Sequence, residues 1–169
     1  MPGEKREEVG AVSPKAMILI IVLCILSLDQ LSKLLVTRNF LYHESLPVIK
    51  GIFHITLIHN RGAAFGILKD QLSLFIFTSV FAIILIILKL KDTGKYYGLS
   101  LSLILAGALG NLIDRLFLGY VIDFLDFRIW PVFNVADTAI TIGAVLLGYA
   151  ILTSEKKGVA KTPRHKVTS

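Results

Sequence analysis

Two acidic residues, Asp123 and Asp137, stand where they could do chemistry together. Each has apolar sequence neighbours, and the chain between them is short enough for the carboxyl groups to meet. Two carboxylates in an apolar setting do not easily both ionise, so such a pair can share one proton. An aspartyl protease needs this arrangement, because one member takes a proton from water and the other polarises the scissile carbonyl. Two unrelated carboxylates, in a loop and at a helix start, are the alternative interpretation of the spacing.

Asp29 and Lys33 lie four residues apart in the first apolar segment, which is the spacing of a helical ion pair. An ionisable residue at membrane depth costs roughly 2.5–3.5 kcal/mol on insertion scales, so each needs a partner or a function. Mutual neutralisation near the interface and a role in substrate binding both remain open for this pair.

Further polar residues follow helical spacing near the two aspartates. Asn111, Asp114 and Arg115 have i, i+3, i+4 spacing and share one helix face. Asp114 is interpreted as a polar hub that ties this helix end to the neighbouring loops. Asn134 stands three residues before Asp137 and faces the same way.

Asn60 and Gly62 precede the second apolar segment. Gly62 and Gly66 have the spacing of close-packing glycines, whereas Asn60 is a polar side chain with no obvious local partner. Asp126 is interpreted as a solvated loop acid.

Other chemistries have little support. The four histidines form no pair at helical spacing, so no zinc site is expected. No Gly-Lys-Ser/Thr phosphate loop and no Gly-x-Ser-x-Gly nucleophile motif occur in the sequence. Water activated by a pair of aspartates needs no metal and no organic cofactor, and none is expected. The single cysteine, Cys24, excludes an intrachain disulfide.

Helices in a membrane must position these residues. The chain has 169 residues, of which 54% are hydrophobic, and its mean hydropathy is +0.73, so lipid is the expected solvent. A bilayer-spanning helix takes about 20 apolar residues. Four segments qualify, at about 16–36, 72–90, 97–118 and 133–153. They make up one membrane domain, 16–153, between an N-terminal tail (1–15) and a basic C-terminal tail (154–169).

Charge predicts the orientation in the membrane. Eleven basic residues lie in the tails and the second loop, against five in the first and third loops. Both tails are therefore expected in the cytoplasm. The net charge of +6 is read as topology and headgroup charge rather than a nucleic-acid site, because no aromatic residues are interleaved. Residues 51–59 and 121–127 alternate or are rich in β-formers, which predicts a small sheet on the outer face.

Five segments of the chain, taken together, resemble the signature segments of the lipoprotein signal peptidase (signal peptidase II) family. They are Asp29-Gln-Leu-Ser-Lys33, Asn60-Arg-Gly-Ala-Ala-Phe-Gly66, Gly107-Ala-Leu-Gly-Asn-Leu-Ile-Asp-Arg115, Val121-Ile-Asp-Phe124 and Phe133-Asn-Val-Ala-Asp137. Each is weak alone, but their common order over residues 16–153 makes the resemblance specific.

The resemblance implies an all-α membrane protein with four transmembrane helices, a small extracytoplasmic β-cradle and a short interfacial helix. It implies that Asp123 and Asp137 are the catalytic dyad. The residues that it places along the substrate are Asn60, Gly62, Asn111, Arg115 and Asn134. The polar residues that it makes structural are Asp29, Lys33 and Asp114.

The same resemblance implies an aspartyl endopeptidase of the bacterial inner membrane, with its active site near the extracytoplasmic face. Its substrates would be prolipoproteins with a diacylglyceryl-modified cysteine, cleaved N-terminal to that cysteine. Globomycin is the expected inhibitor, and a monomer suffices. Two other classes remain open from the residues alone: a proton-coupled transporter with a carboxylate relay, and a non-catalytic assembly subunit. The absence of acids from the cytoplasmic halves of the four segments disfavours a relay.

Overall fold

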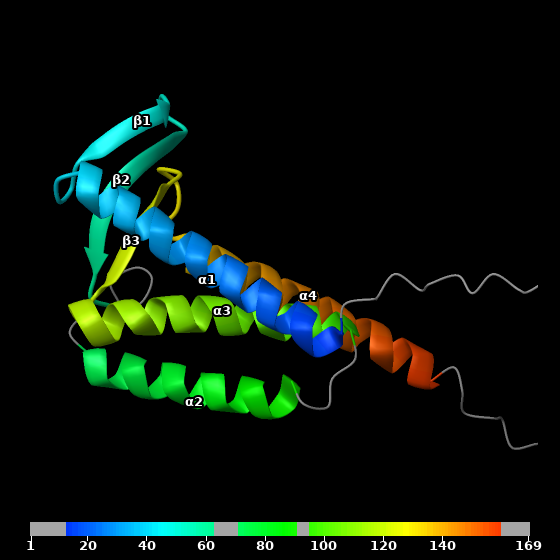
Figure 1. Ribbon diagram of the computed structural model, residues 1–169. Coiled ribbons are helices and arrows are strands. Elements are labelled where there is room, and N and C mark those ends of the chain that lie inside the picture. The colour runs from blue at the N-terminus through cyan, green and yellow to red at the C-terminus, as the bar shows by residue number, and fades with distance from the viewer. Residues whose placement is uncertain (1–12, 63–70, 91–94, 160–169) are drawn as a thin grey trace, which may run out of the picture.

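Four long helices form the body of the molecule in the computed structural model, which describes residues 13–62, 71–90 and 95–159 (Figure 1). They are α1 (Pro14–Asn39), α2 (Leu72–Leu90), α3 (Lys95–Leu118) and α4 (Val135–Val159). All four contain a stretch long and apolar enough to cross a membrane. The prediction of four membrane-spanning helices is confirmed.

Helix α3 is the central helix and packs against the other three. Small residues allow this close approach. Gly107 lies against the carbonyl oxygen of Ala136 in α4, and a Cβ on Gly143 of α4 would lie 2.7 Å from the carbonyl oxygen of Ser100 in α3. A larger residue at either position would push α3 and α4 apart, so these glycines set the distance between the two helices.

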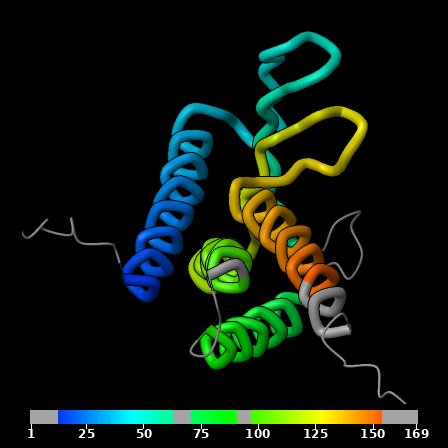
Figure 2. The backbone as a smooth tube through the Cα atoms, turned by 90° about the vertical axis from the view of Figure 1, so that its right-hand side faces the viewer, coloured from blue at the N-terminus to red at the C-terminus, as the bar shows by residue number. Residues whose placement is uncertain are grey.

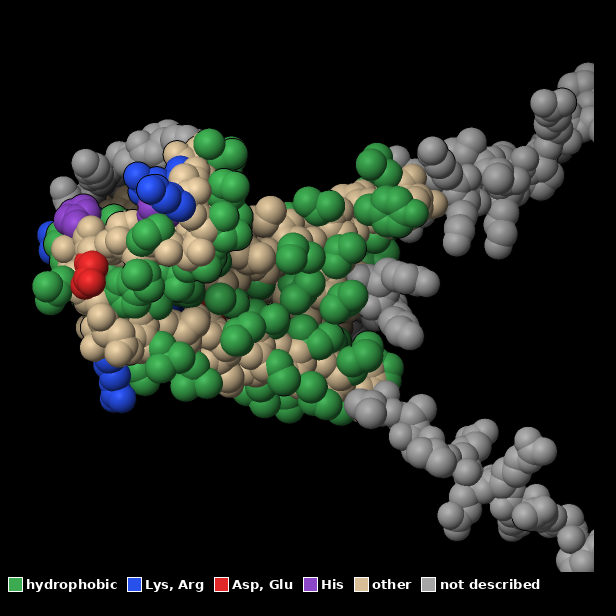
Figure 3. All heavy atoms as spheres, turned by 90° about the horizontal axis from the view of Figure 1, so that it is seen from above, with side chains coloured by type: hydrophobic (Ala, Val, Ile, Leu, Met, Phe, Trp, Pro, Cys, Tyr) green, Lys and Arg blue, Asp and Glu red, His purple; other side chains and the backbone are tan. Residues whose placement is uncertain are grey.

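The outside of the bundle is apolar. Seen from above, hydrophobic side chains cover the lengths of the helices, and the charged and histidine side chains in view gather at the end that carries the sheet (Figure 3). Several leucine, isoleucine and phenylalanine residues of α1 and α2 are more than half exposed, for example Leu35 and Phe77. Such a surface suits contact with lipid, where apolar exposure carries no cost.

A three-stranded antiparallel sheet stands at one end of the bundle. Its strands are β1 (Ser45–Ile49), β2 (Phe53–Asn60) and β3 (Val121–Asp126), in the order β1-β2-β3. The β1–β2 hairpin and the connection from β3 to α4 project on the same side of the helices (Figure 2). The small predicted sheet is confirmed, with β1 as a strand that the sequence did not indicate. The expected short interfacial helix is not among the helices of the described residues and stays a prediction.

The start of α1 and the end of α4 lie at the opposite end of the bundle from the sheet (Figure 1). Helix α1 begins after Ser13, whose hydroxyl accepts a hydrogen bond from the amide of Ala16, and Pro14 takes the first helical position. Helix α4 begins at Val135, two residues later than expected, because Asn134 is its N-terminal cap. Asn134 also contacts both of the predicted catalytic aspartates, Asp123 and Asp137.

Candidate active site

Asp123 is held in β3 by two side-chain amides. Asp123 is 1% exposed, and the register of the sheet pairs Asn60 with Val121, two residues before it. Asn60 Nδ2 donates to Asp123 Oδ2 at 2.8 Å, and Asn134 Nδ2 donates to Asp123 Oδ1 at 2.7 Å. The amide of Asn60 is itself oriented, because the backbone N–H of Gly62 donates to its Oδ1 at 2.9 Å. Both oxygens of Asp123 therefore accept from an amide.

Asp137 lies in the first turn of α4, within a reciprocal N-terminal cap. The backbone N–H of Asp137 donates to Asn134 Oδ1 at 2.8 Å, and the N–H of Asn134 donates to Asp137 Oδ2 at 3.3 Å. The other carboxylate oxygen accepts from Asn111 Nδ2 of α3 at 2.8 Å. A carboxylate at this place also faces the positive end of the helix dipole.

Asn134 joins the two aspartates. It caps α4 in front of Asp137, and its Nδ2 reaches Asp123 Oδ1, Asn111 Oδ1 at 3.1 Å and the carbonyl of Ile122 at 3.3 Å. The structure thus brings Asp123 and Asp137 together at the sheet end of the bundle, although they belong to a strand and a helix.

The environment of Asp123 disfavours its ionised form. Burial, and then the neighbouring charge of Asp137, raise the pKa of Asp123 from 3.8 to about 7. Hydrogen bonds from Asn60 and Asn134 and the charge of Lys33 act in the opposite direction and do not overcome these effects. A carboxyl group with this pKa can keep a proton near neutral pH, as one member of a proton-sharing pair must.

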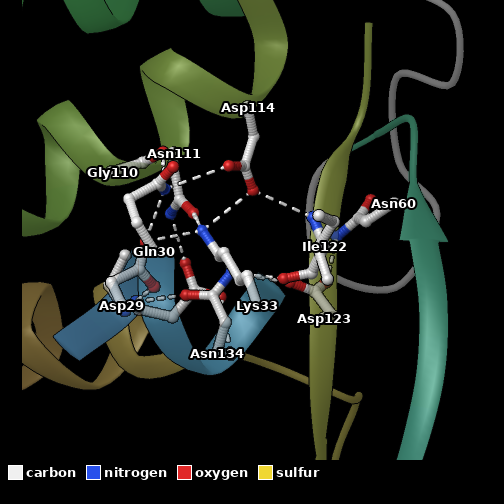
Figure 4. Close-up of polar contacts among 12 residues, drawn as sticks. Asp29, Gln30, Lys33, Asn60, Gly110, Asn111, Asp114, Ile122, Asp123 and Asn134 are labelled. Atoms are coloured by element: carbon white, nitrogen blue, oxygen red, sulfur yellow. Dashed lines mark hydrogen bonds and ion pairs between the residues drawn. The ribbon is translucent and has the colours of Figure 1, made fainter. Parts of the chain in front are cut away.

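A buried ionic cluster of Asp29, Lys33 and Asp114 lies beside Asn111 and Asp123 (Figure 4). Lys33 Nζ lies 2.8 Å from Asp29 Oδ2 and 2.9 Å from Asp114 Oδ2, and all three side chains are at most 2% exposed. The same ammonium group donates to Asn111 Oδ1 at 3.2 Å. Buried charges are tolerated when they are paired and hydrogen-bonded in this way.

The two acids of the cluster, Asp29 and Asp114, also accept hydrogen bonds from the backbone of α4 and β3, which contain Asp137 and Asp123. Asp29 Oδ1 accepts the backbone N–H of Ala136 at 2.9 Å, so a side chain of α1 satisfies a free amide in the first turn of α4. Asp114 Oδ2 accepts the N–H of Ile122 at 3.1 Å, one residue before Asp123. The cluster therefore fixes both the start of α4 and the position of β3.

Gln30 is a member of this cluster that the sequence did not single out. Its Nε2 lies 3.1 Å from Asp29 Oδ2, 3.1 Å from Asp114 Oδ1 and 3.3 Å from the carbonyl oxygen of Gly110. Its position next to Asp29 within an apolar segment could have indicated a buried role, because a side-chain amide inside a membrane needs hydrogen-bond partners.

Arg115 lies near the site without a hydrogen bond to either aspartate in the part of the chain that the structure describes. Its guanidinium carbon is 5.1 Å above the ring centre of Phe75 in α2, the geometry of a cation–π contact. The charges of Asp137 and Asp123 act on it. Arg115 therefore lies within the electrostatic influence of both aspartates while its side chain packs against Phe75.

The interpretation of Asp126 as a solvated loop acid is wrong. It is the last residue of β3 and 5% exposed. Its Oδ2 accepts from the hydroxyl of Thr56 at 2.8 Å and from Arg128 Nη1 at 2.9 Å. The pairing of β2 with β3 buries this carboxylate beside its partners, which is a consequence of register that the local sequence does not show.

Residues 63–66 of the second signature segment lie outside the described residues. Within residues 13–62, 71–90 and 95–159, no group of three or more His, Cys, Asp or Glu side chains is placed to share a metal ion. Asp123 and Asp137 together offer one buried carboxyl group and one carboxylate at a helix start, a combination that can act in acid–base chemistry.

Comparison with known proteins gives a consistent result. Residues 21–153 match the family described as Signal peptidase (SPase) II. A lipoprotein signal peptidase of Halothermothrix orenii is 51% identical over 144 residues, covering 84% of this chain and 99% of that protein. Its counterpart in Moorella thermoacetica is 50% identical over 137 residues, covering 79% and 91%. A solved structure described as a bacterial membrane enzyme at 2.3 Å resolution superposes with a TM-score of 0.79 at 30% identity, covering 90% of this chain and 94% of that one.

Proposed function

The chain belongs to the signal peptidase II family of membrane peptidases, which process the signal peptides of prolipoproteins, and we propose that it does so as an aspartyl endopeptidase with Asp123 and Asp137 as its dyad. The observation that carries this proposal is that Asn134 donates hydrogen bonds to both carboxyl groups, from its backbone N–H to Asp137 and from its side-chain amide to Asp123. The raised pKa of Asp123, about 7, supports the sharing of one proton between them.

In the proposed reaction, the ionised aspartate takes a proton from a water molecule, whose oxygen attacks the scissile carbonyl carbon. The protonated aspartate donates a hydrogen bond to the carbonyl oxygen and stabilises the charge that develops there. When the C–N bond breaks, the nitrogen leaves as an amine with a proton from the dyad, and the new carboxyl group stays on the signal peptide. The dyad then has the single proton with which it started.

The proposed cleavage site is the bond N-terminal to a diacylglyceryl-modified cysteine. A signal peptide is itself an apolar helix, and the acyl chains of the cysteine stay in lipid, so the scissile bond arrives at the membrane interface. The dyad lies at the sheet end of the four spanning helices, at a depth that fits this substrate. We place that end on the extracytoplasmic side and both tails in the cytoplasm, from the distribution of basic residues.

Asn60, Gly62, Asn111, Arg115 and Asn134 are the residues that we propose to line or support the bound substrate. Arg115 is half-buried and carries its charge toward the dyad, where the peptide backbone would pass. The three asparagines also act through the carboxyl groups that they contact. Globomycin is expected to compete with the substrate, and a monomer is expected to be sufficient because one chain supplies both aspartates.

Substitution of each aspartate separately tests the proposal. Asp123→Asn and Asp137→Asn should each abolish cleavage of a lipidated precursor by the purified protein in detergent or lipid, since an amide cannot exchange the required proton. Asp126→Asn is the matched control, because it makes the same change in the same strand on an acid that faces Thr56 and Arg128. It should retain cleavage, and cleavage should stop when globomycin is added.

Thermal unfolding of the variants separates a chemical defect from a structural one. In Asp123→Asn, the new side-chain NH₂ replaces one of the two acceptor oxygens that Asn60 and Asn134 contact. One of these donors then faces another donor, which lowers the free energy of unfolding by about 1–3 kcal/mol. A folded Asp123→Asn or Asp137→Asn variant that still cleaves the precursor would defeat the dyad assignment.

A further inference from the structure

Lys33 is tied to more than its two acidic partners. Its ammonium group has three N–H bonds, and the three neighbours at hydrogen-bond distance are Asp29, Asp114 and the side-chain oxygen of Asn111. The first two contacts neutralise a buried charge. The third, at 3.2 Å, connects α1 to the asparagine that touches Asp137.

The contact with Lys33 determines which way the Asn111 amide points. An ammonium group cannot accept a hydrogen bond, so Asn111 must turn its Oδ1 to Lys33 and its Nδ2 to Asp137. The Nδ2 of Asn134 donates to the same Oδ1 at 3.1 Å and enforces the same orientation. A positive charge on the oxygen side polarises the amide and strengthens its N–H as a donor.

The two carboxyl groups of the dyad are not equivalent. Asp137 accepts from the polarised amide of Asn111 and from a backbone N–H at the positive end of α4, and it is partly exposed. Asp123 is 1% exposed in the sheet. Its two donors, Asn60 and Asn134, are neutral amides, and the charge of Lys33 acts on Asp123 without a hydrogen-bonded link of the kind that Asn111 makes to Asp137.

We propose that Lys33 is a positioning residue of the dyad: through Asn111, its ammonium group holds the negative charge of the pair on Asp137 and leaves the shared proton on Asp123. This role rests on the proposed function, since it specifies which aspartate activates water and which one polarises the carbonyl. Lys33 itself contacts Asn111 and, among the described residues, has no hydrogen bond or ion pair with Asp123 or Asp137.

Other charges face the dyad from each element packed against it. Asp29 comes from α1, and Asp114 and Arg115 come from α3, while β3 supplies the other member of the pair, Asp123. Asp29 and Asp114 together with Lys33 carry a formal charge of −1, so the cluster as a whole does not attract a second negative charge. The favourable effect on Asp137 therefore comes from the charge of Lys33 itself and from its link through Asn111, while the charge of Asp29 opposes it.

The pH profile of kcat/KM for a lipidated precursor tests this role. Lys33→Met keeps most of the side-chain volume and removes the charge and the donor. Without the positive charge the dyad ionises less readily, so the acid limb should move to higher pH by about one unit. At a pH on the original acid limb this shift lowers kcat/KM by roughly tenfold.

Two further variants separate this effect from loss of the fold. Gln30→Met disturbs the same cluster, since Gln30 donates to Asp29, Asp114 and Gly110 but has no hydrogen bond to Asn111 in the part of the chain that the structure describes. It should lower the unfolding temperature and leave the acid limb in place. The double variant Lys33→Met/Asp114→Asn keeps the formal charge of the cluster at −1, because one positive and one negative charge are removed together. In this variant only Asp29 loses an ion-pair partner, whereas Lys33→Met alone leaves both Asp29 and Asp114 without one. The acid limb should shift upward as it does in Lys33→Met.

The outcomes are distinct. An upward shift in a Lys33 variant that Gln30→Met does not reproduce supports the role. A uniform loss of activity at all pH values, with the limb unmoved in the double variant, overturns it and makes Lys33 a stability residue. If the wild-type protein does not cleave the precursor, the proposed function is refuted as well. If the wild-type protein cleaves it but the acid limb does not move in the Lys33 variants, only the role of Lys33 is refuted.

Discussion

Gly110 offers a sharp test of how the polar cluster is packed. It lies in α3 where α1 and α4 meet, and a Cβ added there would be 2.5 Å from Asp29 Oδ2, 3.2 Å from Asp29 Cγ and 3.3 Å from the Cβ of Ala136. The nearest of these separations does not occur in real proteins, so Gly110→Ala must displace the carboxylate. Asp29 cannot move freely, because Lys33, Gln30 and the N–H of Ala136 hold it.

Two opposing effects determine the magnitude. Replacing a glycine in a helix interior by alanine stabilises the helix by roughly 0.8–1.0 kcal/mol. Overpacking a well-filled site costs about 1–3 kcal/mol, and moving Asp29 weakens an ion pair that no water can replace. The second effect wins, so we expect a net loss of about 1–2 kcal/mol, or a fall of about 2–8 °C in Tm. Cleavage should fall too, because Asp29 caps α4 beside Asp137.

Gly148→Ala is the matched control. Gly148 lies in α4 and faces the outside, and a Cβ there would meet nothing within 4 Å. This variant keeps only the helix-propensity gain, so its Tm should equal or exceed that of the wild type. Thermal unfolding followed in detergent, together with residual cleavage after heating, measures both. If Gly110→Ala proved as stable as Gly148→Ala, the close contact between α3 and Asp29 would be refuted.

Three further predictions concern Asp123 and Thr56. Burial and the charge of Asp137 raise the pKa of Asp123 to about 7, so cleavage should decline as pH rises above about 7, where the shared proton is lost. A pH profile that stays flat to higher pH would contradict this prediction. Between pH 3.8 and about 7, Asp123 keeps a proton in the folded protein that it releases in the unfolded chain, so its contribution to the free energy of unfolding falls as pH rises. In thermal unfolding, Asp123→Asn should remove this pH dependence. Thr56→Val removes the 2.8 Å hydrogen bond to buried Asp126 and should cost about 1–3 kcal/mol of stability while kcat stays near the wild-type value; an unchanged Tm would show that the contact is not made.

Local patterns predicted most of the fold. Long apolar runs indicate membrane helices because only a helix satisfies its backbone inside lipid, and all four such runs are helices here. Strands β2 and β3 followed from their residue types. Strand β1 did not, because all five of its residues are exposed and Pro47 interrupts the pattern. A proline is tolerated there since β1 is an edge strand, and only its pairing with β2 makes it a strand.

The candidate site was predictable as a set of residues but not as an arrangement. Asp123 and Asp137 could be selected from their charge in apolar surroundings. The contact between Asp29 and the N–H of Ala136 joins residues 107 positions apart, and no local spacing indicates it. The burial of Asp126 and the partners of Gln30 depend in the same way on how the strands and helices meet.

The sequence by itself determined that the chain crosses the membrane four times and keeps a small set of acids, amides and one lysine among apolar residues. It could do so because hydrophobicity and the cost of burying charge act residue by residue. Only the tertiary structure decided which amide turns toward which carboxylate and which carboxyl group is buried. Those properties depend on contacts among α1, α3, β3 and α4, whose members lie far apart in the chain and meet only when the helices pack.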